Sequence, residues 1–125
     1  MQFLAKLEPQ GYALLRIVSG FLFLWHGTSK LFSYPVPPMD GIPAFVKYGA
    51  GGIELVGGVL VTIGFLTRPA AFICSGTMAV AYWMAHGMVD LFPIVNRGEL
   101  AALYCFTFLY IATRGGGVWS VDGNR

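Results

Sequence analysis

The stretch Gly41–Leu66, which reads GIPAFVKYGAGGIELVGGVLVTIGFL, decides the fold class of this chain. It is long enough to cross a bilayer as a helix, for which about 20 mostly apolar residues suffice. Glu54 lies near its centre and is the only acidic residue in it. A carboxylate in mid-membrane costs about 2.5–3.5 kcal/mol on insertion scales. Glu54 is therefore the first candidate for a functional residue, with a purely structural ion pair as the alternative.

The composition of the whole chain is typical of a membrane protein. Of its 125 residues, 56% are hydrophobic and 11% are charged, whereas a soluble domain has about 25% charged residues. Membrane lipid is therefore the expected surrounding. The net charge of +2 is too small to indicate a nucleic-acid partner. Cys74 and Cys105 lie in apolar stretches without a C-x-x-C motif, which favours two buried thiols over a disulfide or a redox pair.

Four apolar segments predict an all-α membrane protein, an antiparallel bundle of four transmembrane helices that forms one domain over residues 1–125. The spans cover about residues 11–32, 42–66, 69–89 and 98–113. The proline-rich connection 35–41 cannot be helical. Pro69 is suited to the first position of the third helix, and Gly115–Gly117 should end the fourth.

Cationic residues indicate the direction of the spans, because cytoplasmic loops carry more lysine and arginine. This pattern places both termini in the cytoplasm. Lys6, Arg68, Arg114 and Arg125 fall on the cytoplasmic side with Arg16 close by, and Lys30, Lys47 and Arg97 fall on the other. The second span is also rich in glycine, and Gly51 and Gly58 lie two turns apart. Small residues let membrane helices approach closely, either within one chain or in a homo-oligomer.

Depth and helical phase predict that the polar residues of different spans meet. With Arg16 at the inner surface, a rise of 1.5 Å per residue places His26 near the midplane and Lys30 one turn beyond it, on the same face. Glu54 has a matching depth in the antiparallel second span. His86 and Glu99 lie in the outer halves of the third and fourth. We expect His26, Lys30, Glu54, His86 and Glu99 to border one polar region.

Each of these residues also has a structural interpretation. Lys30 and Arg16 could extend only to the lipid headgroups, and His86 could form a hydrogen bond between helices. Glu99 follows Asn96 at the spacing of a helix capping box. His26 and His86 with Glu54 would be a suitable set of metal ligands, but no H-x-x-x-H or H-x-x-E spacing supports them, so no metal site is predicted.

The polar residues have the chemistry that a quinone head requires, namely hydrogen bonds to its carbonyls and a source of protons on reduction. Burial favours the neutral form of Glu54, and a nearby Lys30 favours the charged form. A carboxyl group in this situation can pass protons, and histidine does so near neutral pH. A pH sensor based on His26 and His86 is a further alternative.

The ordered set of short motifs resembles the DoxX family of small bacterial membrane proteins. The matching pieces are Arg16, His26-Gly27-x-x-Lys30-Leu31, Gly52-Ile53-Glu54-x-x-Gly57-Gly58, Gly64-Phe65-Leu66-Thr67-Arg68-Pro69, His86, Asn96-x-Gly98-Glu99 and Gly115-x-Gly117-x-Trp119-Ser120-x-Asp122. The resemblance implies a four-helix, multi-pass protein of the bacterial inner membrane. It also implies an association with redox systems, which include membrane subunits of thiosulfate–quinone oxidoreductase.

These observations lead to two functional hypotheses. In the first, the protein is a subunit or accessory of a quinone-linked redox system, with no covalently bound cofactor and with electrons supplied by a partner protein. Glu54 and His26 would carry the proton or the ligand hydrogen bond, and Lys30, His86, Glu99 and Arg16 would line the ligand site. In the second, the protein is a non-enzymatic component for membrane assembly, stress response or small-solute transport, and its polar cluster is structural.

Overall fold

The computed structural model describes residues 1–38, 41–84, 92–96 and 98–123, which contain helices and no strand. The expected all-α fold is therefore confirmed for this part of the chain. The elements in chain order are α1 (Gln2–Ala5), α2 (Glu8–Phe32), the π-helix η1 (Val46–Ala50), α3 (Gly51–Ile63), α4 (Thr67–Tyr82), α5 (Pro93–Asn96) and α6 (Glu99–Arg114).

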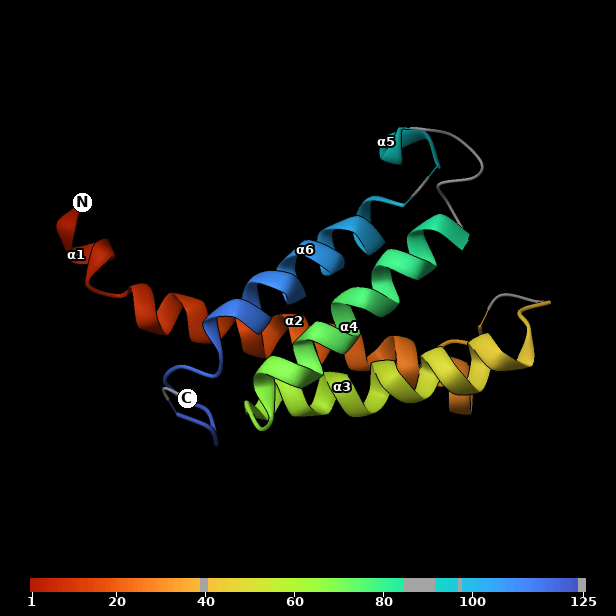
Figure 1. Cartoon of the computed structure of the whole chain (residues 1–125), viewed down its shortest axis with the longest axis horizontal. Helices are drawn as coiled ribbons and strands as arrows, with labels where there is room; N and C mark the ends of the chain where they lie inside the picture. The colour runs from red at the N-terminus through yellow and green to blue at the C-terminus, as the bar shows by residue number, and fades with distance from the viewer. Residues whose placement is uncertain (39–40, 85–91, 97, 124–125) are drawn as a thin grey trace.

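The four long helices form two antiparallel pairs that cross each other (Figure 1). Helix α2 packs mainly against α3, and α4 packs mainly against α6. The start of the chain and the segment after α6 lie at the same end of the molecule (Figure 1). The core between the pairs includes Phe23, Val61, Cys74 and Phe108, all with no exposed surface.

The apolar stretch around Glu54 forms a continuous helix, because η1 leads directly into α3. This helix, Phe45–Ile63, has 19 residues and is the one helix of the described residues that is long and apolar enough to cross a membrane. Many large apolar side chains of the other helices also point outward. Examples are Leu14, Phe21, Phe72 and Phe106, which are 48–69% exposed. This exterior suits a lipid surrounding better than water.

Helices α2 and α3 approach closely because glycines lie at their contact. A Cβ atom added at Gly27 would lie 2.4 Å from the Leu55 backbone nitrogen, and one added at Gly58 would lie 2.8 Å from the Cβ of Leu24. Neither site has room for a methyl group. The predicted role of glycine in close helix packing is confirmed for this pair.

Two helix starts differ from the sequence prediction. Helix α4 begins at Thr67 rather than at Pro69, because Asp122 accepts hydrogen bonds from the Leu66 and Thr67 amides at 3.2 and 2.8 Å and caps the helix. Helix α6 begins at Glu99 with Gly98 as its N-cap. The capping box that would place Glu99 at the third helical position is therefore wrong. The predicted helix end at Gly115 is confirmed.

The segment after α6 folds back over the turn between α3 and α4. The Val121 amide donates to the Ile63 carbonyl at 3.1 Å, and the Asp122 amide donates to the Gly64 carbonyl at 2.8 Å. A Cβ atom at Gly64 would lie 2.2 Å from the Cβ of Ser120, so the two segments are in tight contact. We refer to the segment Gly115–Asp122 together with Arg16 as the clasp, because Arg16 joins this segment to the end of α3.

Candidate functional site

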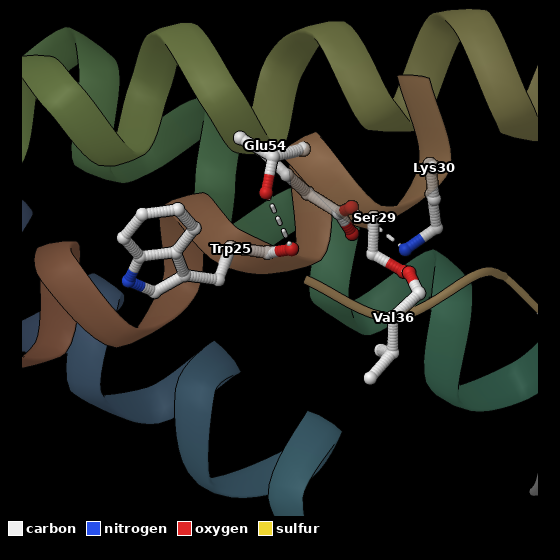
Figure 2. Close-up of polar contacts among 6 residues, drawn as sticks. Trp25, Ser29, Lys30, Val36 and Glu54 are labelled. Carbon is white, nitrogen blue, oxygen red and sulfur yellow. Dashed lines mark hydrogen bonds and ion pairs between the residues drawn. The ribbon is translucent and has the colours of Figure 1, made fainter. Parts of the chain in front are cut away.

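Lys30 of α2 and Glu54 of α3 form an ion pair inside the protein. The Lys30 Nζ atom lies 2.7 Å from Glu54 Oε1 and donates a hydrogen bond to it (Figure 2). The Glu54 side chain is 2% exposed, whereas that of Lys30 is 22% exposed. The sequence predicted that the carboxylate of the second span contacts the polar face of the first span. This contact is observed between Glu54 and Lys30. Lys30 connects a buried charge to the surface.

The close approach of α2 and α3 sets the geometry of this pair. Gly51 lies beside Lys30, and a Cβ atom added there would be 3.0 Å from the Lys30 Cβ atom. One turn earlier on α2, Gly27 lies against the backbone at Leu55. With larger residues at these contacts the helices would separate. The glycines therefore position the ammonium and carboxylate groups as well as pack the helices.

Two hydroxyl groups hold the end of α2 beside the ion pair. Thr28 donates a hydrogen bond from Oγ1 to the Tyr34 carbonyl at 2.7 Å, and Ser29 donates from Oγ to the Val36 carbonyl at 2.7 Å. Figure 2 shows Ser29 and Val36 next to Lys30. Ser33 ends the helix in the left-handed conformation, with φ of 57°. The connection after α2 is thereby folded back against the helix that carries Lys30.

His26 lies one turn before Lys30 on α2 and is exposed. Its ring packs at 6.3 Å from the ring of Phe23 and edge-on at 5.8 Å from the ring of Tyr104 on α6. No hydrogen bond joins His26 to Glu54 within the described residues. The two residues assigned the proton-carrying role therefore lie on neighbouring helices without a hydrogen bond between them, and Lys30, one turn after His26 on α2, contacts Glu54.

Tyr104 and Cys74 are two neighbours of the ion pair that the sequence reasoning did not single out as site residues. The Glu54 charge lies within electrostatic range of both the Cys74 thiol and the Tyr104 hydroxyl. Cys74 has no exposed surface and packs against Gly57. Its predicted burial is confirmed. Tyr104 is 8% exposed and touches His26. Nothing in the sequence distinguishes it from the other aromatic residues of the last apolar segment.

Arg16 lies at the opposite end of α2 from the ion pair. Fourteen residues separate it from Lys30 in one helix, which corresponds to about 21 Å. Its side chain has no exposed surface. Within the described residues, the acceptors of the guanidinium are backbone carbonyls, those of Val61, Thr62, Gly116, Val118 and Trp119, at 2.7–3.5 Å. Arg16 is part of the clasp and makes no contact with the Lys30–Glu54 pair in the described structure. Its assignment to a ligand site stays a prediction.

The remaining two predicted site residues lie elsewhere or outside the described part. Glu99 is exposed at the start of α6 and lines a surface groove of about 580 Å³ with Pro93, Leu103 and Phe106. No contact joins Glu99 to Lys30 or Glu54 in the part of the chain that the structure describes. His86 lies in the stretch 85–91, outside the described residues. Its role stays a prediction.

Within residues 1–38, 41–84, 92–96 and 98–123, no group of three histidine, cysteine or acidic side chains could hold a metal ion. What the site offers is acid–base and hydrogen-bonding chemistry. A carboxylate and an ammonium group form one contact between α3 and α2, and an imidazole and a phenol form another between α2 and α6, with Lys30 and His26 one turn apart on α2. Such groups can hold a polar head group or exchange a proton with it.

Comparison with known proteins gives one family and several relatives. The model of the family described as DoxX matches residues 11–87. An uncharacterized protein of Haemophilus influenzae is 43% identical, with 98% of this chain and 96% of the relative covered. The "putative oxidoreductase CatD" of Bacillus subtilis is 29% identical over 90% of this chain and 84% of its own length. The inner membrane protein YqjF of Escherichia coli is 28% identical over 94% and 93%, respectively. No solved structure matches.

Proposed function

We propose, from the premise that this chain belongs to the DoxX family, that it is a membrane subunit or accessory of a quinone-linked redox system. The family and the Escherichia coli relative, named an inner membrane protein, make it a membrane protein. The name of the Bacillus subtilis relative, an oxidoreductase, supports the redox part of the proposal. The site around Glu54 supports the rest.

The observation that carries the proposal is the unequal use of the two Glu54 oxygens. Oε1 accepts the hydrogen bond from Lys30 at 2.7 Å. Oε2 receives no hydrogen bond from any described residue. Oε2 is not among the fully enclosed unpaired side-chain atoms of the described residues, so a carboxylate with one oxygen held and one unpaired can accept a proton or a ligand's hydrogen-bond donor. This favours a working carboxyl over a purely structural one.

The proposed roles follow from position. Glu54 exchanges a proton, Lys30 stabilises its charged form, and His26 passes the proton to the exposed side of α2. A quinone would supply the redox chemistry, taking up electrons and protons together, with the electrons provided by a partner redox protein. His86 and Glu99 would extend the polar region outward, and Arg16 would only hold the fold in which this region is built.

We also propose that α2, Phe45–Ile63, α4 and α6 are four transmembrane spans with both termini in the cytoplasm of the bacterial inner membrane. The apolar exterior of the helix pairs and the common end of the first and last segments support this topology (Figure 1). Labelling of single cysteines from either side of the membrane tests it. Exposure of both ends to the periplasm would contradict the proposed orientation.

The functional test is the substitution Glu54→Gln, which keeps the shape of the side chain and removes its ability to bind and release a proton. We expect quinone-linked activity in membrane vesicles to fall at least tenfold, since acid–base catalysis contributes about 10²–10⁴-fold. The matched control is Glu8→Gln, because Glu8 also forms an ion pair, with Arg114 at 2.8 Å, but on the surface. Unchanged activity in Glu54→Gln at equal protein levels would overturn the proposal.

The second candidate function is a non-enzymatic membrane component in which the pair is structural. The observation that favours it is the good geometry of the Lys30–Glu54 bond. Reconstituted protein separates the two functions. A short-chain ubiquinone that raises the unfolding temperature supports the first, because a ligand selective for the folded state stabilises it. No stabilisation, together with capture of partner proteins, supports the second.

A further inference from the structure

Tyr104 is held in a fixed orientation by aromatic neighbours from two helices. Its ring stacks on Phe108 of the same helix, with centroids 5.7 Å apart and planes inclined by 12°. On the α2 side it packs against Phe23 at 5.1 Å. Phe23 and Phe108 are themselves fully buried. The direction of the phenol is therefore set by the core rather than by a hydrogen bond.

The hydroxyl group of Tyr104 has no hydrogen-bond partner among the described residues. This is unusual for a side chain that is 92% buried, since buried tyrosine hydroxyls normally find a partner. The oxygen is also not sealed in. Among the described side chains, the fully enclosed polar atom without a partner is Oε1 of Gln10. The Tyr104 hydroxyl is thus both unpaired and accessible.

Tyr104 borders the candidate site from the α6 side. Its ring meets the exposed His26 ring edge-on at 5.8 Å. Lys30 lies one turn beyond His26 on α2. Three helices therefore contribute polar groups to one region, and the Tyr104 hydroxyl is a buried donor there without a partner among the described residues.

We propose that the Tyr104 hydroxyl is a ligand-binding group that donates a hydrogen bond to a carbonyl oxygen of a quinone head placed between α2 and α6, beside His26. This inference rests on the proposed quinone-linked function and adds a residue to it. A phenol hydroxyl donates one hydrogen bond, which matches the acceptor chemistry of a quinone carbonyl. The rigid ring holds the donor in place before the ligand arrives, which lowers the entropic cost of binding.

The substitution Tyr104→Phe tests this role because it removes the hydroxyl and keeps the packed ring. No hydrogen bond with a described residue is lost, so the unfolding temperature should stay close to that of the wild type. The dissociation constant of a water-soluble short-chain ubiquinone, measured by quenching of tryptophan fluorescence, should rise about threefold to tenfold, the value of one hydrogen bond. The matched control is Tyr110→Phe on the same helix, which removes the hydroxyl of an exposed tyrosine. It should bind like the wild type.

A second probe distinguishes a hydrogen bond from a general effect on the site. An analogue in which hydrogen replaces both carbonyl oxygens of the quinone should bind the wild type and Tyr104→Phe equally. Equal ubiquinone affinity in the wild type and Tyr104→Phe would overturn the assignment of Tyr104 and leave the proposed function standing. Weaker binding of both probes by Tyr104→Phe would also overturn it, as a packing effect. If ubiquinone fails to bind the wild type, both proposals fall.

Discussion

The two buried charges of the described residues, Arg16 and Glu54, are compensated in opposite ways. Arg16 donates hydrogen bonds to five backbone carbonyls and has no exposed surface. In the part of the chain that the structure describes, Glu54 has a single partner, Lys30, whose side chain is 22% exposed. The Arg16 end of the molecule is closed by the clasp, and the Glu54 end keeps a carboxylate oxygen and a phenol that have no partner among the described residues. Burial alone therefore does not identify a functional charge.

The comparison shows what to look for in a buried ionisable group. A charge whose hydrogen-bonding capacity is fully used by fixed backbone groups acts as a structural connector. A charge with spare capacity, and with neighbours that lead to the surface, can take part in binding or proton transfer. Two of the three substitutions below test whether Arg16 and its clasp are structural, and the other tests how strongly Glu54 depends on Lys30.

The largest expected effect is that of Arg16→Ala, which would leave the carbonyls of the clasp without their donor. We expect a loss of about 3–5 kcal/mol in the free energy of unfolding, measured by circular dichroism in detergent micelles. The loss in the free energy of unfolding for Arg16→Lys should lie between zero and the loss for Arg16→Ala, because an ammonium group keeps three donors but lacks the planar, forked geometry of guanidinium. The control Arg114→Ala breaks a surface pair with Glu8 and should cost about 1 kcal/mol. Similar losses in the free energy of unfolding for Arg16→Ala and Arg114→Ala would contradict the structural role of Arg16.

A smaller effect is expected from Lys30→Met, which leaves the Glu54 carboxylate without its ion-pair partner. The single variant should lose about 2–3 kcal/mol, and Lys30→Met combined with Glu54→Gln should recover part of it. A double-mutant cycle should give a coupling free energy of about 1–3 kcal/mol. Additive losses in the two single variants would mean that the 2.7 Å contact contributes nothing to folding.

The smallest effect is expected from Asp122→Ala, which removes the cap of α4. Asp122 accepts hydrogen bonds from the Thr67 amide and hydroxyl at 2.8 Å each. Loss of an N-terminal cap typically costs about 0.5–2 kcal/mol. Asp122→Asn should lose less, because its amide oxygen can still accept a hydrogen bond. If Asp122→Ala unfolds at the wild-type temperature, the cap formed by the Asp122 side chain contributes nothing to stability.

The sequence predicted the helices well and two of their starts poorly. Apolar length and glycine content were enough to locate α2, α3, α4 and α6 and the contact between α2 and α3. The start of α4 was missed because its cap, Asp122, lies 55 residues away from Thr67. A helix capped from another part of the chain carries no local signal, so Pro69 was the natural choice.

The candidate site was predictable only in part, for a similar reason. Depth along antiparallel helices brought Glu54 near both His26 and Lys30 but did not decide between them, and the structure shows that Lys30 is the partner. Tyr104 could not be selected in this way, because its contact with His26 depends on how α6 crosses α2, and helix crossing angles are not encoded in a single periodic pattern. Arg16 was expected near the inner membrane surface, whereas it lies inside α2 and is fully buried. Its acceptors are backbone carbonyls, which are present at every residue and leave no trace in the sequence.

The clasp has a consequence for the order in which the protein can be completed during synthesis. Arg16 belongs to the first long helix, yet three of its five acceptors, the carbonyls of Gly116, Val118 and Trp119, lie after the last one. In a nascent chain, the guanidinium can form these three hydrogen bonds only after about a hundred further residues have left the ribosome. Until then the acceptors available to it are the carbonyls of Val61 and Thr62, so the clasp can form only after residues 116–119 have been translated.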